Sequence, residues 1–322
     1  MSIRIGIIGP GRISDDQLAP GIGALDDAVL WSVLSRDLRR ASNFAEKHGA
    51  ISPNPAHTDL SSMLADSELD AVIIATPDRF HAEQACTAAE AGKHVFVEKP
   101  MATSVAEAQS IIDACQTGGR VLAIAYHLRW HTGLRTVRDR IQQGEIGSVR
   151  HIRVHWTFRA ADDSDWRAFA ATGRWWSLAA NGTHCLDLIR WMLRPEAGEV
   201  VAIQAVTGGS VWETPHDETA IVSARFESGA TAEFCTSVLF DSASRVEIYG
   251  SDGTVICDDT LGRHGAGAIL FNGSPLEYEV VNPYEGEIRD FVEAIRDGRA
   301  PEVDGHEGMR NVALLIEAAK NL

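Results

Sequence analysis

Two residues in this chain stand where they could carry out chemistry, a lysine and a histidine. Lys99 follows the apolar run at residues 95–97 and is followed directly by Pro100. Side chains just beyond the carboxyl end of a parallel strand face the ligand crevice. An ammonium fixed there could therefore polarise a substrate oxygen. His184 lies three residues before Asp187, and an imidazole can carry a proton near neutral pH.

His184 also has a structural interpretation. His184, Asp187 and Trp191 recur at helical spacing, which places them on one face of a helix. A single histidine on a helix is more often a structural residue than a catalytic one. The interpretation of His184 as a proton carrier therefore depends on its pairing with Lys99.

The first strand of the chain leads into a glycine pattern that could hold a pyrophosphate. Residues 3–8 are mostly apolar and run into residues 9–14, whose pattern is G-x-G-x-x-S. The first glycine permits a tight turn, the second lets a phosphate approach the backbone, and the next helix offers free N–H groups. Two glycines also suit any tight strand-to-helix turn, but their position after the first strand favours a dinucleotide site.

The end of the second strand indicates which dinucleotide is bound. Residues 29–34 are followed by Ser35 and Arg36, whereas an NAD-preferring site has Asp or Glu at this place. A hydroxyl and a guanidinium, with Arg40 one turn later, would accept a 2′-phosphate through charge-assisted hydrogen bonds. Alternatively, the arginines form a solvated helix face that Asp37 partly neutralises. We favour NADP as the cofactor, with NAD as the alternative.

The elements around these residues predict an α/β fold with two domains. In residues 1–125, strand and helix patterns alternate, which predicts a doubly wound parallel sheet, a Rossmann domain. After residue 126 the pattern changes to a long helix and strands of period two. Residues 126–322 therefore form a second α/β domain with a large open, mainly antiparallel sheet, and the C-terminal helices could pack back on the first domain. The expected strands are 150–158, 220–226, 230–238, 245–249 and 254–258.

Composition limits the partners of the chain. It has 322 residues and a net charge of −16, which disfavours nucleic acid as a partner. No apolar run approaches the roughly 20 residues of a membrane span, and the first strand starts at once, so we expect a cytoplasmic protein without a signal peptide. The five cysteines form no CxxC pair, and His151 and His155 fall on a polar strand face, so we expect no metal.

Several motifs now resemble those of the glucose–fructose oxidoreductase / inositol dehydrogenase / MocA (Gfo/Idh/MocA) family. They are Gly9-Pro-Gly11, Thr76-Pro77-x-x-x-His81, Ala91-Gly92-Lys93-His94-Val95-x-x-Glu98-Lys99-Pro100, Gly182-x-His184-x-x-Asp187-x-x-Arg190-Trp191, Asp290-Phe291-Val292-x-Ala294-Ile295-Arg296-Asp297-Gly298 and Val303-Asp304-Gly305. The resemblance implies a Rossmann domain, a C-terminal domain with an open sheet, and a homodimer or homotetramer. From the architecture we expect the open face of that sheet to form the interface. The resemblance also implies NAD(P)-dependent redox chemistry on sugars, polyols or related diols.

The resemblance assigns roles to individual residues. Lys99 would polarise or protonate the substrate oxygen, and His184 would exchange a proton with it while hydride moves to or from nicotinamide. The expected cofactor-binding residues are Gly9, Gly11, Arg12, Ile13, Ser35, Arg36, Arg40, Thr76, Pro77, His81, Glu98 and Lys99. The expected substrate-binding residues are Tyr126, His127, Trp176, Asn181 and Asp187.

One departure from the family pattern leaves alternatives open. Many members have an aspartate where this chain has Ala180, and a methyl group cannot hydrogen-bond. Either Asn181 or Asp187 takes over that role, or the substrate is unusual, or activity is reduced. Trp175 and Trp176 would suit sugar rings or aromatic diols, or would simply pack. The competing functions are a cofactor-binding sensor that has lost catalysis and a reductase of C=N or C=C bonds.

Overall fold

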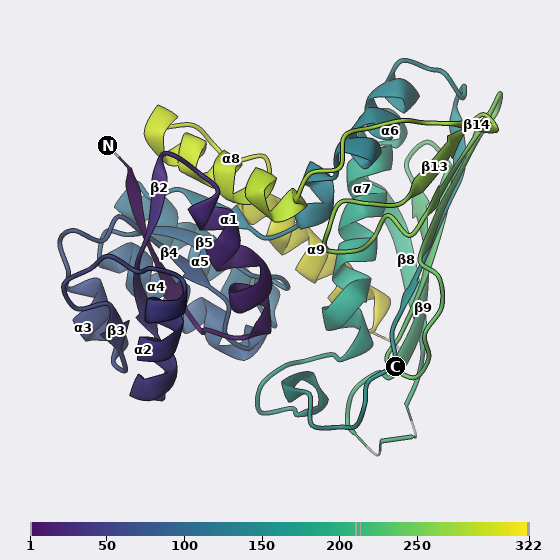
Figure 1. The fold of residues 1–322 in the computed structure, drawn as a ribbon. Helices are drawn as coiled ribbons and strands as arrows, with labels where there is room; N and C mark the ends of the chain where they lie inside the picture. The colour runs from purple at the N-terminus through teal and green to yellow at the C-terminus, as the bar shows by residue number, and fades with distance from the viewer. Residues whose placement is uncertain (1, 210, 213, 321–322) are drawn as a thin grey trace. The chain divides into compact units, whose positions relative to one another are not determined.

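Figure 1 shows the computed structural model, which describes residues 2–209, 211–212 and 214–320. The chain divides into two compact units. The first comprises Met1–Tyr126 and Tyr284–Val312, and the second comprises His127–Pro283 and Ala313–Leu322. Residues 284–312 thus group with the first unit, because apolar side chains of this segment, such as Ile288 and Phe291, are part of its buried core.

The first unit is built on a six-stranded parallel sheet with the order β3-β2-β1-β4-β5-β6. The prediction of a doubly wound parallel sheet is confirmed. The strands are β1 (Ile3–Ile8), β2 (Ala28–Leu34), β3 (Ala56–His57), β4 (Ala71–Ile74), β5 (His94–Val97) and β6 (Leu122–Ile124). Strands β1, β4 and β5 are neighbours at the centre, so the residues after their carboxyl ends lie at one edge of the sheet.

Helices cover both sides of a sheet whose strands are almost wholly buried. They are η1 (Ser14–Leu18, a π-helix), α1 (Ala19–Gly23), α2 (Leu38–Lys47), α3 (Leu60–Leu64), η2 (Asp78–Phe80), α4 (His81–Glu90), α5 (Val105–Gly118) and α8 (Pro283–Asp297). Helix α9 (Gly305–Ala318) begins in the first unit, and its residues from Ala313 on belong to the second. Residues of α1, α2 and α8 share one core cluster with β1, β2, β4 and β5. Helices α4 and α5 pack against each other.

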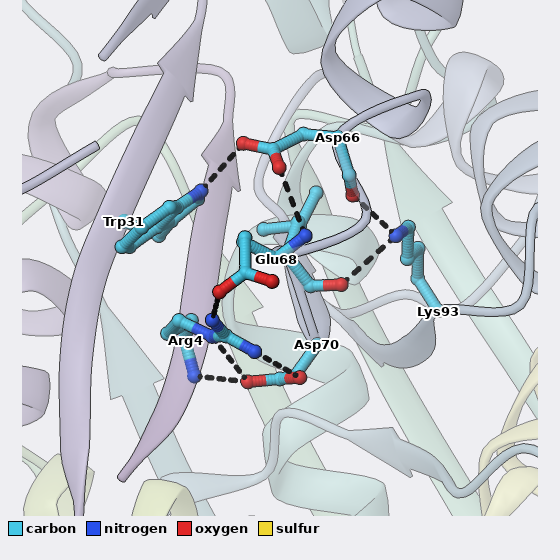
Figure 2. Close-up of polar contacts among 7 residues, drawn as sticks. Arg4, Trp31, Asp66, Glu68, Asp70 and Lys93 are labelled. Atoms are coloured by element: carbon cyan, nitrogen blue, oxygen red, sulfur yellow. Dashed lines mark hydrogen bonds and ion pairs between the residues drawn. The ribbon is translucent and has the colours of Figure 1, made fainter. Parts of the chain in front are cut away.

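A polar cluster fixes the amino ends of these strands, the edge opposite the glycine turn (Figure 2). Arg4 of β1 forms an ion pair with Asp70 at 3.0 Å and contacts Glu68. Trp31 of β2 donates from Nε1 to Asp66 at 2.7 Å. Lys93 donates from Nζ to the carbonyl oxygens of Asp66 (2.7 Å) and Leu69 (2.9 Å). Lys93 belongs to the same sequence motif as Lys99, but its ammonium is used in holding the fold together.

The second unit contains an eight-stranded sheet with the order β14-β13-β12-β11-β7-β10-β9-β8. Strands β7 and β10 are parallel, and every other pair is antiparallel, so the prediction of a mainly antiparallel sheet is confirmed. The strands are β7 (Val149–Thr157), β8 (Val200–Gly208), β9 (Thr219–Phe226), β10 (Thr231–Ser237), β11 (Arg245–Gly250), β12 (Thr254–Asp258), β13 (Ala268–Phe271) and β14 (Ser274–Pro275).

One face of this sheet is covered by helices and the other is exposed. Residues of α6 (Thr132–Gln142) and α7 (Thr183–Ala197) share the core cluster with the inward side chains of the strands. Shorter helices are η3 (His127–Trp130), η4 (Trp166–Ala168) and η5 (Leu178–Gly182, a π-helix). In the part of the chain that the structure describes, no helix combines the length and apolarity needed to cross a membrane.

Candidate active site

The glycine turn after β1 has the geometry that a pyrophosphate site needs. Gly9 has φ +94°, and a Cβ there would lie 2.9 Å from the carbonyl carbon and oxygen of Ala75. A Cβ on Gly11 would meet nothing within 4 Å, so this position leaves open space beside the backbone. Ser14 is fully buried, and its hydroxyl donates to the carbonyl oxygen of Gly9 at 2.8 Å. Ser14, which stands where a third glycine is usual, therefore stabilises the turn with a side-chain hydrogen bond to its first residue.

Arg12 and Ile13, which lie between Gly11 and Ser14, have different environments. Ile13 is half-buried and packs against the core of the first unit. Arg12 is exposed, and its guanidinium forms an ion pair with Asp16 one helical turn later, at 3.3 Å. Contact of either residue with a cofactor stays a prediction.

The end of β2 presents unengaged guanidinium groups. Asp37 caps α2, because its carboxylate accepts from the backbone N–H groups of Arg39 (2.8 Å) and Arg40 (3.4 Å). The N–H of Asp37 donates to the Ser35 hydroxyl at 3.3 Å. Arg36 and Arg40 are exposed, and within the described chain their side chains make no ion pair. A hydroxyl and two available guanidiniums fit an anion, whereas the carboxylate of Asp37 is directed at the helix backbone.

A buried histidine links the segments that follow β4 and β5. The ring nitrogens of His81 lie 2.8 Å from the carbonyl oxygen of Thr76 and 3.0 Å from that of Pro100. An imidazole can donate to both oxygens only when both ring nitrogens carry protons. The Lys99–Pro100 peptide is cis. The contacts of His81 are those of a residue that positions the loop carrying Lys99, and cofactor contact by Thr76, Pro77 and His81 stays a prediction.

Lys99 lies at the carboxyl edge of the sheet. The N–H of Glu98 donates to the carbonyl oxygen of Ile74 at 2.9 Å, so pairing continues one residue beyond β5. The N–H of Lys99 donates to Glu98 Oε2 at 3.1 Å. Glu98 is buried and Lys99 is half-buried. The first unit thus brings Lys99, Thr76 and the glycine turn to one edge, since β1, β4 and β5 are adjacent.

In the second unit, His184 lies in an aromatic environment in the first turn of α7. Its ring centroid is 4.8 Å from that of His127, at an interplanar angle of 82°, and 5.5 Å from that of Trp156. The structure therefore brings together two of the predicted site residues, His127 and His184, and adds Trp156. Tyr126 ends the first unit and has no exposed surface.

A buried ion pair holds the helix face on which His184 lies. Arg129 donates from Nε and Nη2 to the two carboxylate oxygens of Asp187, at 2.9 and 2.6 Å. The side chains are only 3% and 1% exposed. Both oxygens of Asp187 are thus engaged with Arg129, so these contacts favour a positioning role, and substrate binding by Asp187 stays a prediction. No local pattern marks Arg129, because its partner lies 58 residues away in the chain.

Asp217, also absent from the sequence-based site, organises the segment that leads into α7. Its carboxylate accepts from the N–H groups of Trp176 (3.0 Å) and Leu178 (2.8 Å) and from the Ser177 hydroxyl (2.6 Å). Burial raises the pKa of Asp217, and these hydrogen bonds act in the opposite direction. The Asp217 carboxylate therefore fixes the backbone at the start of the π-helix η5.

The remaining predicted substrate contacts are in packed surroundings. Trp176 has no exposed surface and packs with Ala168 and Val238, which favours the packing alternative for this residue. Asn181 donates from its amide to the carbonyl oxygen of Trp156 at 3.4 Å. Substrate contact by Trp176, Asn181 or His127 stays a prediction.

Comparison with known proteins identifies relatives along almost the whole chain. A 1,5-anhydro-D-fructose reductase of Ensifer adhaerens is 27% identical over 98% of this chain and 95% of its own length. A scyllo-inositol 2-dehydrogenase (NADP(+)) of Bacillus subtilis is 28% identical over 99% of this chain and 96% of its own. The crystal structure of aldose-aldose oxidoreductase from Caulobacter crescentus, complexed with glycerol, has the same fold, with a TM-score of 0.91 at 24% identity and coverage of 100% and 99%.

Two family models match the two parts of the chain. The model described as "Oxidoreductase family, NAD-binding Rossmann fold" matches residues 3–126. The model described as "GFO/IDH/MocA C-terminal domain" matches residues 134–256. Together with the glycine turn, the Glu98–Lys99–Pro100 segment and the His184 helix, these matches show that the chain belongs to the Gfo/Idh/MocA family of NAD(P)-dependent dehydrogenases and reductases.

Proposed function

We propose that this protein is an NADP(H)-dependent oxidoreductase that transfers hydride between nicotinamide and a hydroxyl or carbonyl carbon of a sugar, polyol or related diol. The observation that carries the proposal is the position of Lys99, which follows β5 at the carboxyl edge of the sheet, the edge that also holds the glycine turn with its open space at Gly11. Nicotinamide, when bound, supplies the hydride chemistry. The names of relatives, an anhydrofructose reductase and an inositol dehydrogenase, support a sugar-like substrate.

The proposed roles of the two chemical residues follow from charge and from the family. Lys99 would stabilise the negative charge that develops on the substrate oxygen, which is usually the largest catalytic contribution. His184 would exchange the proton of that oxygen, with its ring oriented by His127 and Trp156.

Replacing Lys99 by alanine tests this mechanism. We expect kcat for reduction of sugar-like carbonyls to fall by about two orders of magnitude or more, while NADPH still binds. Lys47→Ala, which removes an exposed lysine on α2, is the matched control. Turnover that survives in Lys99→Ala would overturn the mechanism. If the wild-type protein neither oxidises NADPH with any aldose or ketose nor reduces NADP with any polyol or diol, the sensor hypothesis motivated by Ala180 replaces it.

The preference for NADP rests on Ser35, Arg36 and Arg40. Arg40→Ala removes a guanidinium that could donate charge-assisted hydrogen bonds, so NADP affinity should fall roughly 10- to 100-fold while NAD affinity stays unchanged. Arg39→Ala on the same helix is the control. Equal thermal stabilisation of the wild-type protein by NADP and NAD would contradict the preference.

We further propose that the exposed face of the second unit's sheet forms a homodimer or homotetramer. Val206 of β8 and Ile221 of β9 are paired in register and are 71% and 51% exposed. Adjacent exposed apolar side chains of this kind mark interaction surfaces. Ile221→Asp should lower the mass measured by light scattering to that of a monomer, and a wild-type monomer would refute the proposal.

A further inference from the structure

Glu287, which no motif singled out, is a buried acid in the first unit that the proposed mechanism does not use. It lies in α8, in the segment that joins the first unit from the C-terminal part of the chain. Its side chain is only 1% exposed. Neither carboxyl oxygen has a hydrogen-bond partner in the described structure. A buried carboxylate without partners is strongly disfavoured in its charged form.

The packing of α8 on β5 places Glu287 next to the segment that carries Lys99. Phe291 of α8 and Phe96 of β5 are in edge contact, with ring centroids 5.5 Å apart. Glu287 lies one turn before Phe291, about 6 Å along the helix. Glu98 lies two residues after Phe96, about 6.6 Å along the strand and on the same face. If α8 and β5 run in opposite directions, Glu287 and Glu98 are therefore neighbours, one step beyond the contact of the two phenylalanines.

The charged groups that act on Glu287 show that α8 and β5 run in opposite directions. Glu98 and Lys99 are its electrostatic partners, which lie after β5 and not before it. Helix α1, which packs against α8 where Gly21 faces Ile288, consists of Ala19–Gly23 and carries no titratable residue. Burial, and after it the charge of Glu98, raises the pKa of Glu287 well above its ordinary value, while Lys99 acts in the opposite direction.

We propose that the carboxyl group of Glu287 stays protonated next to the Glu98–Lys99 segment, so that Glu98, and not Glu287, supplies the negative charge near the Lys99 ammonium. This rests on the proposed role of Lys99. A second carboxylate would hold the ammonium more tightly and would oppose the approach of an anionic dinucleotide and of a developing alkoxide. Glu287 itself transfers no proton in the reaction.

Glu287→Gln is the decisive variant, because glutamine has the shape of the protonated acid and cannot ionise. At neutral pH we expect Glu287→Gln to keep the NADPH affinity and kcat of the wild-type protein within a few-fold. At alkaline pH the wild-type protein should lose both as Glu287 ionises, and the variant should lose less of either. Glu287→Met, similar in length and apolar, should behave like the glutamine variant. Glu293→Gln, on an exposed part of the same helix, is the control.

A measurement that needs no substrate separates this proposal from the proposed function. The infrared difference spectrum of the wild-type protein minus Glu287→Gln at neutral pH should show the carbonyl stretch of a protonated carboxylic acid. Absence of that band would overturn the proposal, as would alkaline profiles of NADPH affinity that superimpose for wild type and Glu287→Gln. A protein that shows the band and the divergent NADPH profiles but turns over no sugar would refute the oxidoreductase mechanism and leave Glu287 as assigned.

Discussion

Removing one partner of the Arg129–Asp187 ion pair should destabilise the protein far more than removing both. The pair is bidentate, at 2.9 and 2.6 Å, and almost inaccessible to solvent. Breaking such a pair leaves an uncompensated buried charge, which costs about 3–5 kcal/mol. Asp187→Asn and Arg129→Met should each lose that amount, on the order of a third of the whole stability of a domain. The melting temperature should fall by roughly 6–20 °C.

The double variant Arg129→Met/Asp187→Leu should recover most of this loss, because apolar side chains often replace a buried ion pair at little cost. Urea unfolding of the four proteins gives the coupling energy, expected to exceed about 2 kcal/mol. The exposed pair Arg12–Asp16 provides the control, since Asp16→Asn should cost less than about 1 kcal/mol. A loss below about 1 kcal/mol in Asp187→Asn, accompanied by a raised KM, would refute the positioning role and favour substrate binding.

Three further predictions concern the first unit. Gly9→Ala should lower stability because of its φ of +94° and its contact with Ala75, whereas Gly11→Ala should keep the melting temperature and weaken NADPH binding measured by fluorescence. Burial lowers the pKa of His94 to about 4, so the stability linked to its neutral form is complete above pH 6.5 and is lost as pH falls toward 4, on the order of 2–3 kcal/mol in urea unfolding. Lys93→Met should lose about 2–4 kcal/mol of stability without changing KM, because one buried and one partly buried carbonyl oxygen lose their donor.

Five strands of the second unit could be predicted from the sequence because their side-chain pattern is local, whereas the edge strand β8 (Val200–Gly208), most of whose side chains are not buried, was not among the expected strands. Residues 150–158 show an alternation of apolar and polar side chains, and β7 covers Val149–Thr157. The glycine turn and the segment at Lys99 could also be predicted, since each follows directly from a strand end. Pairing between strands is not local, and the parallel alignment of β7 with β10 across about 80 residues leaves no mark in either pattern.

The buried charged groups near the candidate site residues were also harder to predict, because the residues they act on are distant in the sequence. Arg129, Asp217 and Glu287 each act on a residue more than 35 positions away in the chain. A charged residue in a helix is ordinarily exposed. Glu287 lies one turn from both Tyr284 and Phe291, which places it on the apolar face of α8, but this spacing does not say which strand that face covers. The packing of α8 in the folded chain, including the contact of Phe291 with Phe96, decides that outcome.

The two lysines at the ends of β5 show why residue type and motif membership do not identify a site. Lys93 and Lys99 are six residues apart, so the strand separates them by roughly 20 Å. At the amino end, loop carbonyl groups accept from Lys93, and burial lowers the pKa of its ammonium. At the carboxyl end, β1, β4 and β5 all finish at one edge, and the half-buried Lys99 follows there beside a carboxylate. Strand polarity therefore decides which lysine can meet a ligand, and chemical labelling of the folded protein should modify Lys99 before Lys93.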